Sequence, residues 1–209
     1  MEISTRKKIA LFGGTFDPFH IGHLELLQNL YDEIKPDKII IVPTGHPYMK
    51  EVQGRKITCA GDRVGMLKAG LKDACFPWEI AMFEVEKDSP SYSVETVEYL
   101  RQNLDEPENS DIYFLCGSDV LFEIDKWYEF RKLISDIILT VIPRGLDDID
   151  AIKKRKKQLE DEYGAEIIIS DFRGEDISSS AIRDNIEAGE KLLPADTYEY
   201  IREHHLWEV

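Results

Sequence analysis

The sequence of 209 residues has few of the features that cross-link small secreted proteins or anchor proteins in membranes. It contains three cysteines, which lie far apart and form no Cys-x-x-Cys pair, so neither a disulfide framework nor a zinc cluster is predicted. The longest apolar runs have the length of a strand and not of a membrane span. The first residues also lack the apolar segment of a secretion signal. We therefore expect a cytoplasmic protein with reduced thiols and no membrane partner.

Positive charge is also scarce, because 26 Lys and Arg stand against 41 Asp and Glu, for a formal net charge of −15. A protein of that charge repels a nucleic-acid backbone, so no nucleic-acid partner is expected. The basic run at 153–157 is followed by acidic residues in an amphipathic segment, and we interpret it as a solvated helix face. A small anionic substrate stays compatible with this charge, because the local field of a site can oppose the global sign.

The chain contains no linker rich in Pro, Gly or Ser and no internal repeat. Short apolar runs alternate with amphipathic stretches instead, which is typical of an α/β fold with a Rossmann-like, doubly wound parallel sheet. We expect a single domain over residues 1–209, with an α/β core over 1–175 and a small C-terminal helical appendage over 176–209. The expected strands are 8–12, 38–43, 78–83, 112–116, 136–143 and 166–170, and the expected helices are 21–34, 58–72, 93–103, 125–134, 147–163, 179–188 and 195–205.

The stretch ALFGGTFDPFHIGHLELLQ, residues 10–28, contains more glycine and histidine than a structural turn requires. Gly13 and Gly14 follow the first strand directly, so the chain can turn sharply there and a ligand can approach the backbone closely. The backbone N–H groups of Gly14, Thr15 and Phe16 could then form an anion-binding concavity. This pattern indicates a ligand site at the end of the first strand.

Two histidines open the helix that follows. His20 and His23 lie on one face of its first turn, beside unpaired N–H groups and the positive end of the helix dipole. Gly22 in that turn costs about 1 kcal/mol relative to alanine, a local cost expected where function overrides folding. We favour a phosphate site over the alternative that the histidines only cap and pack the helix, and on this view His23 contributes little to stability.

Two motifs carry a resemblance to a known family. His20-Ile21-Gly22-His23 resembles the (H/T)xGH signature of the nucleotidyltransferase α/β phosphodiesterase superfamily, and ISSSAIR at 177–183 resembles its second signature, ISSxxxR. Within that superfamily the chain is most similar to bacterial nicotinate-nucleotide adenylyltransferases, over nearly its whole length. The further blocks that carry this similarity are VPTGHPYMK, SYSVETVEYL, GSDVLFEIDKWYEF and LLPADTYEYIREHHLW.

The resemblance implies an enzyme of NAD biosynthesis that transfers the adenylyl group of ATP to nicotinate mononucleotide and forms deamido-NAD and pyrophosphate. It implies Mg²⁺ bound mainly through the ATP phosphates, with no metal site in the protein. Nicotinamide mononucleotide or phosphopantetheine as the acceptor, and a nucleotide-binding protein without turnover, are the open alternatives. The sequence also leaves open whether the chain forms a homo-oligomer.

The resemblance implies catalytic roles for His20, His23 and Arg183. Asp119 would accept hydrogen bonds from the nucleotide ribose, although from the residues alone it could equally cap a helix. Likewise, Ser178 suits a helix N-cap and Arg183 could be a surface charge. The residues implied to bind ATP are Gly13, Gly14, Thr15, Phe16, Gly22, Gly117, Asp119, Ser178 and Ser179.

The acceptor half of the site is implied by a separate set of residues. Trp127 would stack on the nicotinate ring, although an aromatic pair at this spacing more often belongs to a core. Arg144 would contact phosphate, but here a glycine follows it where the family commonly has proline. Tyr48-Met49 stands where the family usually has Pro-His, so the choice between nicotinate and nicotinamide stays open. The residues implied to bind the acceptor are Lys50, Tyr92, Ser93, Trp127, Tyr128 and Arg144.

Overall fold

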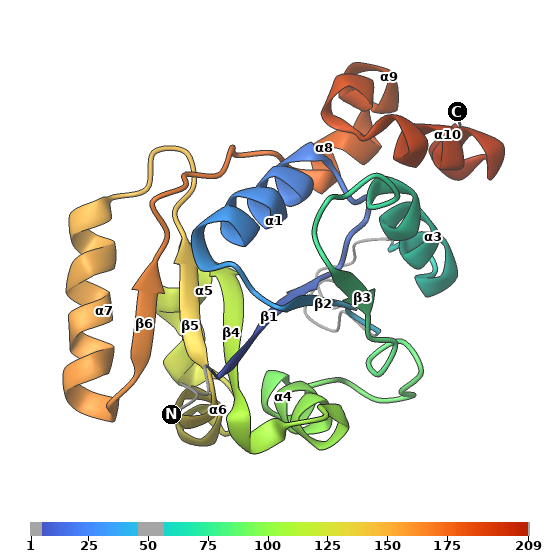
Figure 1. Cartoon of the computed structure of the whole chain (residues 1–209). Helices are drawn as coiled ribbons and strands as arrows, with labels where there is room; N and C mark the ends of the chain where they lie inside the picture. The colour runs from blue at the N-terminus through green and yellow to red at the C-terminus, as the bar shows by residue number, and fades with distance from the viewer. Residues whose placement is uncertain (1–5, 46–56, 209) are drawn as a thin grey trace.

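A six-stranded sheet forms the centre of the protein (Figure 1). The structure is a computed structural model that describes residues 6–45 and 57–208. All neighbouring strands pair in parallel, in the order β3-β2-β1-β4-β5-β6. The strands are β1 (Lys7–Gly14), β2 (Lys38–Pro43), β3 (Trp78–Ile80), β4 (Ser110–Gly117), β5 (Ile138–Ile142) and β6 (Glu166–Ile169). The predicted α/β class with a doubly wound parallel sheet is confirmed.

Helices connect the strands and follow the last of them. The α-helices are α1 (Ile21–Ile34), α3 (Ala60–Gly70), α4 (Ser93–Asn103), α5 (Ser118–Glu123), α6 (Phe130–Asp136), α7 (Ile149–Tyr163), α8 (Ser179–Asp184), α9 (Ile186–Gly189) and α10 (Ala195–Glu203). Short 3₁₀ helices lie at η1 (Pro107–Asn109), η2 (Ile124–Lys126), η3 (Glu190–Leu192) and η4 (Leu206–Glu208). None of the helices within the described ranges has the length and apolar character needed to cross a membrane.

Several predicted boundaries were wrong, each for a local reason. The strand expected at 78–83 ends at Ile80, because β3 is an edge strand that pairs only with residues 39–41 of β2. The helix expected at 125–134 starts at Phe130, after Glu129 turns the chain with a φ of 48°. The helix expected at 179–188 breaks at Asn185, whose side chain accepts the N–H of Ala188 and starts α9.

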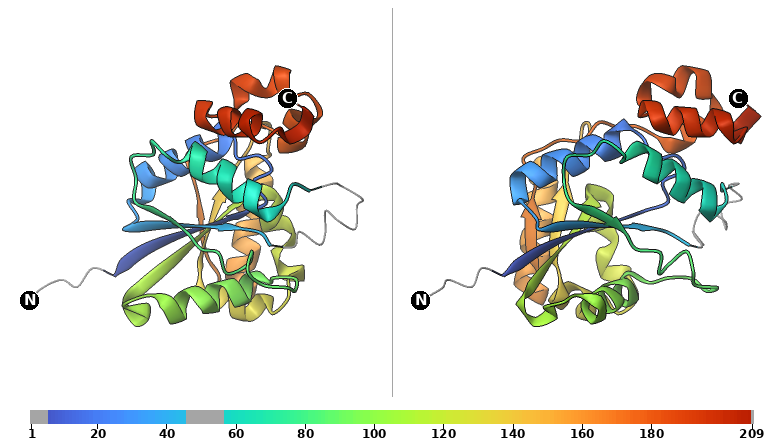
Figure 2. Two further views of the ribbon diagram at one scale, coloured as in Figure 1. Left: turned by 90° about the vertical axis from the view of Figure 1, so that its right-hand side faces the viewer. Right: turned by 45° about the vertical axis from the view of Figure 1, so that its right-hand side comes forward.

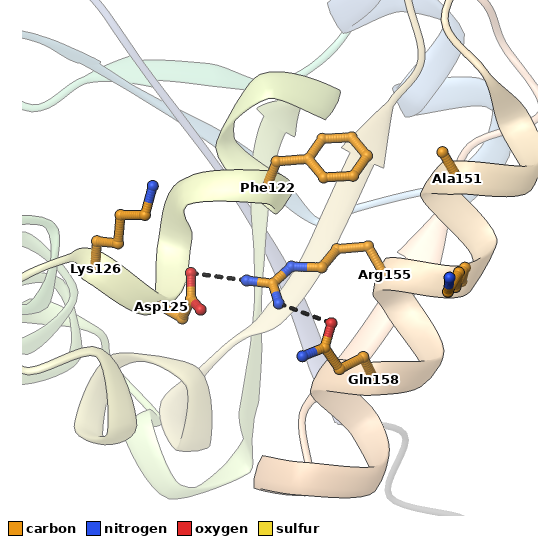
Figure 3. Close-up of a pocket in the computed structure, with 7 residues that line it drawn as sticks. Phe122, Asp125, Lys126, Ala151, Arg155 and Gln158 are labelled. Atoms are coloured by element: carbon orange, nitrogen blue, oxygen red, sulfur yellow. Dashed lines mark hydrogen bonds and ion pairs between the residues drawn. The ribbon is translucent and has the colours of Figure 1, made fainter.

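The sheet is buried on both faces, as its apolar strands predict. Helices α1 and α3 cover one face and pack through residues such as Leu27, Leu30 and Leu67. Helices α4 to α7 cover the other face, where an open groove lies between α5 and α7 (Figure 3). Arg155 lines this groove, and its guanidinium contacts Asp125 at 2.7 Å.

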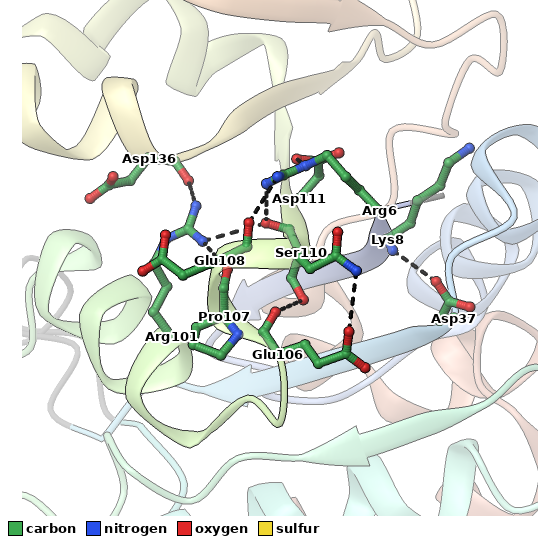
Figure 4. A network of polar contacts seen from close by, with 11 residues as sticks. Arg6, Lys8, Asp37, Arg101, Glu106, Pro107, Glu108, Ser110, Asp111 and Asp136 are labelled. Carbon is green, nitrogen blue, oxygen red and sulfur yellow. Dashed lines mark hydrogen bonds and ion pairs between the residues drawn. The ribbon is translucent and has the colours of Figure 1, made fainter. Parts of the chain in front are cut away.

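The amino edge of the sheet is closed by arginines (Figure 4). Arg101 donates to the carbonyl of Asp136 at 2.7 Å and to that of Pro107 at 3.1 Å. Arg6 donates to the carboxylate of Asp111 at 2.6 Å. The Arg101 bonds satisfy main-chain oxygens and the Arg6 bond pairs with a carboxylate, so this edge is tied together by structural contacts.

The C-terminal helices pack on α3, above the carboxyl edge of the sheet (Figure 2). The hydroxyl of Tyr200 in α10 donates to Asp62 at 3.2 Å, and that of Thr197 donates to the carbonyl of Met66 at 3.2 Å. Gly65 allows this approach, since a β-carbon there would collide with the ring of Tyr200. The appendage predicted over 176–209 is therefore joined closely to the α/β core.

Alanine in place of Gly65 should destabilise the protein by about 1–3 kcal/mol, as at other overpacked sites. The matched control is Gly61→Ala in the same helix, where the nearest atom to a new β-carbon would be the Cys59 sulfur at 3.9 Å. That change should leave the free energy of unfolding unchanged or raise it by up to about 1 kcal/mol. Urea denaturation measures the free energy of unfolding of both variants. Equal stabilities for the two variants would contradict close packing of α10 on α3.

Candidate active site

The strand order reverses between β1 and β4, and in open α/β sheets ligands bind at the carboxyl ends of the strands at this point. Gly13 and Gly14 end β1, and Gly117 ends β4. Helix α1 begins shortly after β1, and α5 begins directly after β4. A β-carbon on Gly13 would meet no atom within 4 Å among the described residues. The topology therefore places the first predicted motif where a ligand is expected.

The two histidines of the first motif are in direct contact. His20 is the N-cap of α1, and its backbone N–H donates to Nδ1 of His23 at 3.2 Å. The two rings stack with centroids 3.6 Å apart. His20 is only 6% exposed, and its Nδ1 has no hydrogen-bond partner within residues 6–45 and 57–208. A buried ring nitrogen in this state is compatible with a ligand partner.

Burial, and to a smaller extent the nearby positive charge of Arg144, lower the pKa of His20 to about 4. The imidazole is therefore neutral near pH 7 in the ligand-free protein. A bound phosphate would raise the pKa of His20 again, since it brings negative charge next to the ring.

His23 also packs against its neighbours, which the sequence analysis did not expect. Its ring stacks on Phe19 with centroids 5.4 Å apart and meets the edge of Phe16 at 5.3 Å. It also accepts the cap hydrogen bond from His20. The expectation that His23 contributes little to stability is therefore not supported, because this imidazole joins α1 to an aromatic cluster.

Close packing accounts for two residues that were predicted to bind ATP. A β-carbon on Gly22 would lie 3.2 Å from Ile177 of the second motif, so glycine permits that contact. Phe16 is 2% exposed and its ring lies in the core, with a backbone φ of 51°. Only the backbone of Phe16 is then available to a ligand.

The two motifs meet in space. Arg183 donates to the carbonyl of Asp17, and its guanidinium lies 3.3 Å from the Asp17 carboxylate. The hydroxyl of Ser179 donates to the carbonyl of Pro18 at 3.3 Å. Ser178 caps α8, as predicted, by accepting the N–H of Ala181 at 3.3 Å. The second motif therefore supports the loop that precedes His20.

A second group surrounds Gly117. The guanidinium of Arg144 would lie 3.0 Å from a β-carbon at Gly117, and Asp119 would overlap that atom. Only glycine therefore leaves room for both side chains. Arg144 is held in place because its backbone N–H donates to Asp147 at 2.7 Å, while Ser118 donates to the same carboxylate. Asp119 lies in the first turn of α5 and is not its N-cap, which is Gly117.

Two of the residues predicted for the acceptor, Tyr92 and Tyr128, meet beside α4 and α6, apart from Arg144 at Gly117. The rings of Tyr92 and Tyr128 lie 4.6 Å apart, and both are exposed. Ser93 is the first residue of α4. Trp127 is partly buried against the core and meets Phe114 edge to face at 6.2 Å. Lys50 and the neighbouring Tyr48 and Met49 lie outside the described residues.

Sequence reasoning missed Arg63, which is 1% exposed. Its guanidinium donates to the carbonyls of Thr15 at 2.7 Å, Thr44 at 2.7 Å, Gly45 at 3.2 Å and Thr58 at 3.0 Å. It therefore joins the loops after β1 and β2 to the start of α3. The sequence feature that could have revealed this role is an arginine within the buried stripe of an amphipathic helix, three and four residues before Met66 and Leu67.

Carboxylates and histidines do not gather into a metal centre in the part of the chain that the structure describes. The buried Asp17 pairs with Arg183, and Asp119 lies beside Arg144. Each of these two carboxylates therefore lies next to a cation of the protein.

Methionine in place of Arg63 should lower the free energy of unfolding by about 3 kcal/mol or more, because four backbone carbonyls lose their donor. The matched control is Arg202→Met, which removes an exposed ion pair with Glu199 at 3.5 Å and should cost less than about 1 kcal/mol. Urea denaturation measures both variants. If Arg63→Met lowers the free energy of unfolding no more than Arg202→Met does, these carbonyls do not depend on the guanidinium.

The pKa of His20 makes stability depend on pH. The unfolded chain gains a proton at this residue near pH 6.5, whereas the folded chain does so near pH 4. Stability should therefore fall by about 3 kcal/mol as the pH falls between these values. His20→Gln should remove that part of the pH dependence in urea unfolding across the window. His204→Gln, at an exposed histidine, is the control. An identical change in the pH dependence of stability in both variants would contradict the lowered pKa of His20.

The chain is similar to known proteins over most of its length. Residues 11–185 match the model of the family described as cytidylyltransferase-like. A protein of Clostridium tetani (strain Massachusetts / E88) named "Probable nicotinate-nucleotide adenylyltransferase" is 37% identical, over 96% of this chain and 99% of its own. A protein of Clostridium botulinum (strain Alaska E43 / Type E3) with the same name is 34% identical, over 97% and 98%.

The fold is also similar to that of a solved structure. Plasmodium falciparum nicotinic acid mononucleotide adenylyltransferase, complexed with NaAD, superposes with a TM-score of 0.74. The match covers 97% of this chain and 98% of the other at 19% sequence identity, so it supports the fold. Together, the family match and the full-length relatives show that this chain belongs to the cytidylyltransferase-like family and, within it, to the nicotinate-nucleotide adenylyltransferases.

Proposed function

We propose that this chain transfers the adenylyl group of ATP to nicotinate mononucleotide, forming deamido-NAD and pyrophosphate. The observation that carries the proposal is the buried Nδ1 of His20 at the start of α1, near Arg144, which has no hydrogen-bond partner among the residues that the structure describes. This arrangement offers a hydrogen-bonding ring, a helix dipole and a cation to a phosphate group. The names of the full-length relatives support the substrate pair.

The chemistry requires alignment more than proton transfer. A phosphate oxygen of the acceptor attacks the α-phosphorus of ATP, and the bond from that phosphorus to the pyrophosphate oxygen breaks. The attacking oxygen is already anionic, so no strong base is needed. His20, His23 and Arg144 would offset the negative charge that builds up on the transferring group. Gly13 and Gly14 would let the phosphates approach the backbone closely.

Other residues would hold the two substrates in register. Asp119 would accept hydrogen bonds from the ribose hydroxyls of ATP, beside the end of β4. Arg183 already contacts Asp17 in this structure, so we assign it the role of holding the phosphate-binding loop and adding positive charge. For the acceptor, the aromatic group of Tyr92, Trp127 and Tyr128 would bind the pyridine ring. The N-terminus of α4 at Ser93 would face its carboxylate.

We propose that Mg²⁺ enters with the substrate as MgATP. The described residues gather no group of metal ligands, so the phosphates and water would supply the coordination. Lowering the free Mg²⁺ concentration should then act on the affinity for ATP and leave the folded structure unchanged.

Mass spectrometry of the product tests the proposed function. With MgATP and nicotinate mononucleotide, the protein should release deamido-NAD and pyrophosphate in equal amounts. Nicotinamide mononucleotide and phosphopantetheine should react more slowly. No product from nicotinate mononucleotide would contradict the substrate assignment, and no pyrophosphate with any of the three acceptors would contradict catalysis.

The variant His23→Asn separates chemistry from folding, since the asparagine oxygen can still accept the cap hydrogen bond of His20. Its kcat should fall by about two orders of magnitude or more, as for other lost donors to a transition state. Circular dichroism at the assay temperature should show a folded protein. Near-normal turnover of this variant would remove His23 from the mechanism.

A further inference from the structure

The turn that follows β5 is held rigidly. The backbone N–H of Arg144 donates to the Asp147 carboxylate at 2.7 Å, and the N–H of Asp147 donates to the Arg144 carbonyl at 2.9 Å. The N–H of Gly145 donates to the Gly174 carbonyl at 3.1 Å, and Arg173 donates to the Gly145 carbonyl at 2.5 Å. Few degrees of freedom remain in this turn.

This turn presents Leu146 completely to water. The side chain is 103% exposed, whereas the other large exposed apolar residues among those described range from 36% to 54%. A single exposed leucine is common on protein surfaces. Here, however, Leu146 lies two residues after Arg144, on a turn fixed against the site. A preformed turn that holds an apolar side chain in water is suited to contact a ligand without an ordering cost.

The strand order predicts which part of a nucleotide would reach this turn, given the function proposed above. The ends of β1, β4 and β5 follow one another along the carboxyl edge, at a spacing of about 4.8 Å. With the phosphates at the end of β1 and the ribose at Asp119 after β4, as proposed above, the base would lie over the turn after β5. Asp147 and Asp148 in and beside the turn are compatible with a base, which carries no charge.

We propose that Leu146 packs against one face of the adenine base of bound ATP and sets a preference for purine over pyrimidine nucleoside triphosphates. Apolar contact scales with the area covered, and a purine offers two fused rings where a pyrimidine offers one. The same acidic neighbours disfavour a contact between two copies of a chain that carries a net charge of −15.

The proposal is tested by calorimetric titration of MgATP and MgCTP in the absence of acceptor. Leu146→Ala should weaken ATP binding about fivefold and CTP binding less than twofold, and Leu146→Asp should weaken ATP binding more than tenfold. The steady-state KM for ATP should rise in parallel, with kcat and the KM for nicotinate mononucleotide unchanged. Phe122→Ala is the matched control at an exposed apolar residue of the groove between α5 and α7, and it should change neither affinity.

Three outcomes would overturn the inference and leave the proposed function intact. ATP affinities within twofold of wild type in both Leu146 variants would do so, and so would equal losses for ATP and CTP. Sedimentation showing that wild type associates and Leu146→Asp does not, with ATP affinity unchanged, would assign the leucine to self-association. A wild-type protein that binds ATP but makes no deamido-NAD would instead defeat only the proposed function, and one that does not bind ATP would defeat both.

Discussion

The buried guanidinium of Arg63 is the interaction on which the rest of the site depends. Each of its described hydrogen bonds ends on a backbone carbonyl, and together they compensate for removing the charge from water. A trans peptide points its C=O and the next N–H in opposite directions. With the carbonyl of Thr15 turned toward Arg63, the N–H of Phe16 therefore points away from it. The cation thus fixes both the position and the polarity of the loop after β1.

Thr58 extends this arrangement to the C-terminal helices. Its carbonyl accepts a bond from Arg63, its N–H donates to Asp17 at 3.3 Å, and its hydroxyl accepts the indole N–H of Trp207 at 3.1 Å. Asp17 in turn contacts Arg183 of the second motif. Residues far apart in the chain therefore hold one loop. This explains why a small helical appendage accompanies an otherwise complete α/β core.

The sequence predicts those parts of the fold that depend on residues close together in the chain. The spacing of apolar residues gave the bounds of α1, β2 and α4, and the serine before α8 predicted its cap. The position of Arg63 in the apolar stripe of α3 was visible in the sequence, but its role was not, because its partners are backbone carbonyls, which leave no pattern in a sequence. The double role of His23 was missed as well, since its stacking on Phe19 depends on how the loop folds back. Contacts between distant segments, such as Ile177 against Gly22, depend on tertiary packing alone.

The local charge of the site explains how an acidic protein could bind a polyanionic substrate. Arg63, Arg144 and Arg183 bring positive charge to one edge of a chain whose net charge is −15. Arg63 and Arg183 are already engaged by oxygens of the protein, and Arg144 lies beside Asp119. Burial and Arg144 keep His20 neutral while the site is without ligand. Under the function we propose, an incoming phosphate reverses that balance, so that binding of the polyanion and uptake of a proton by His20 favour each other.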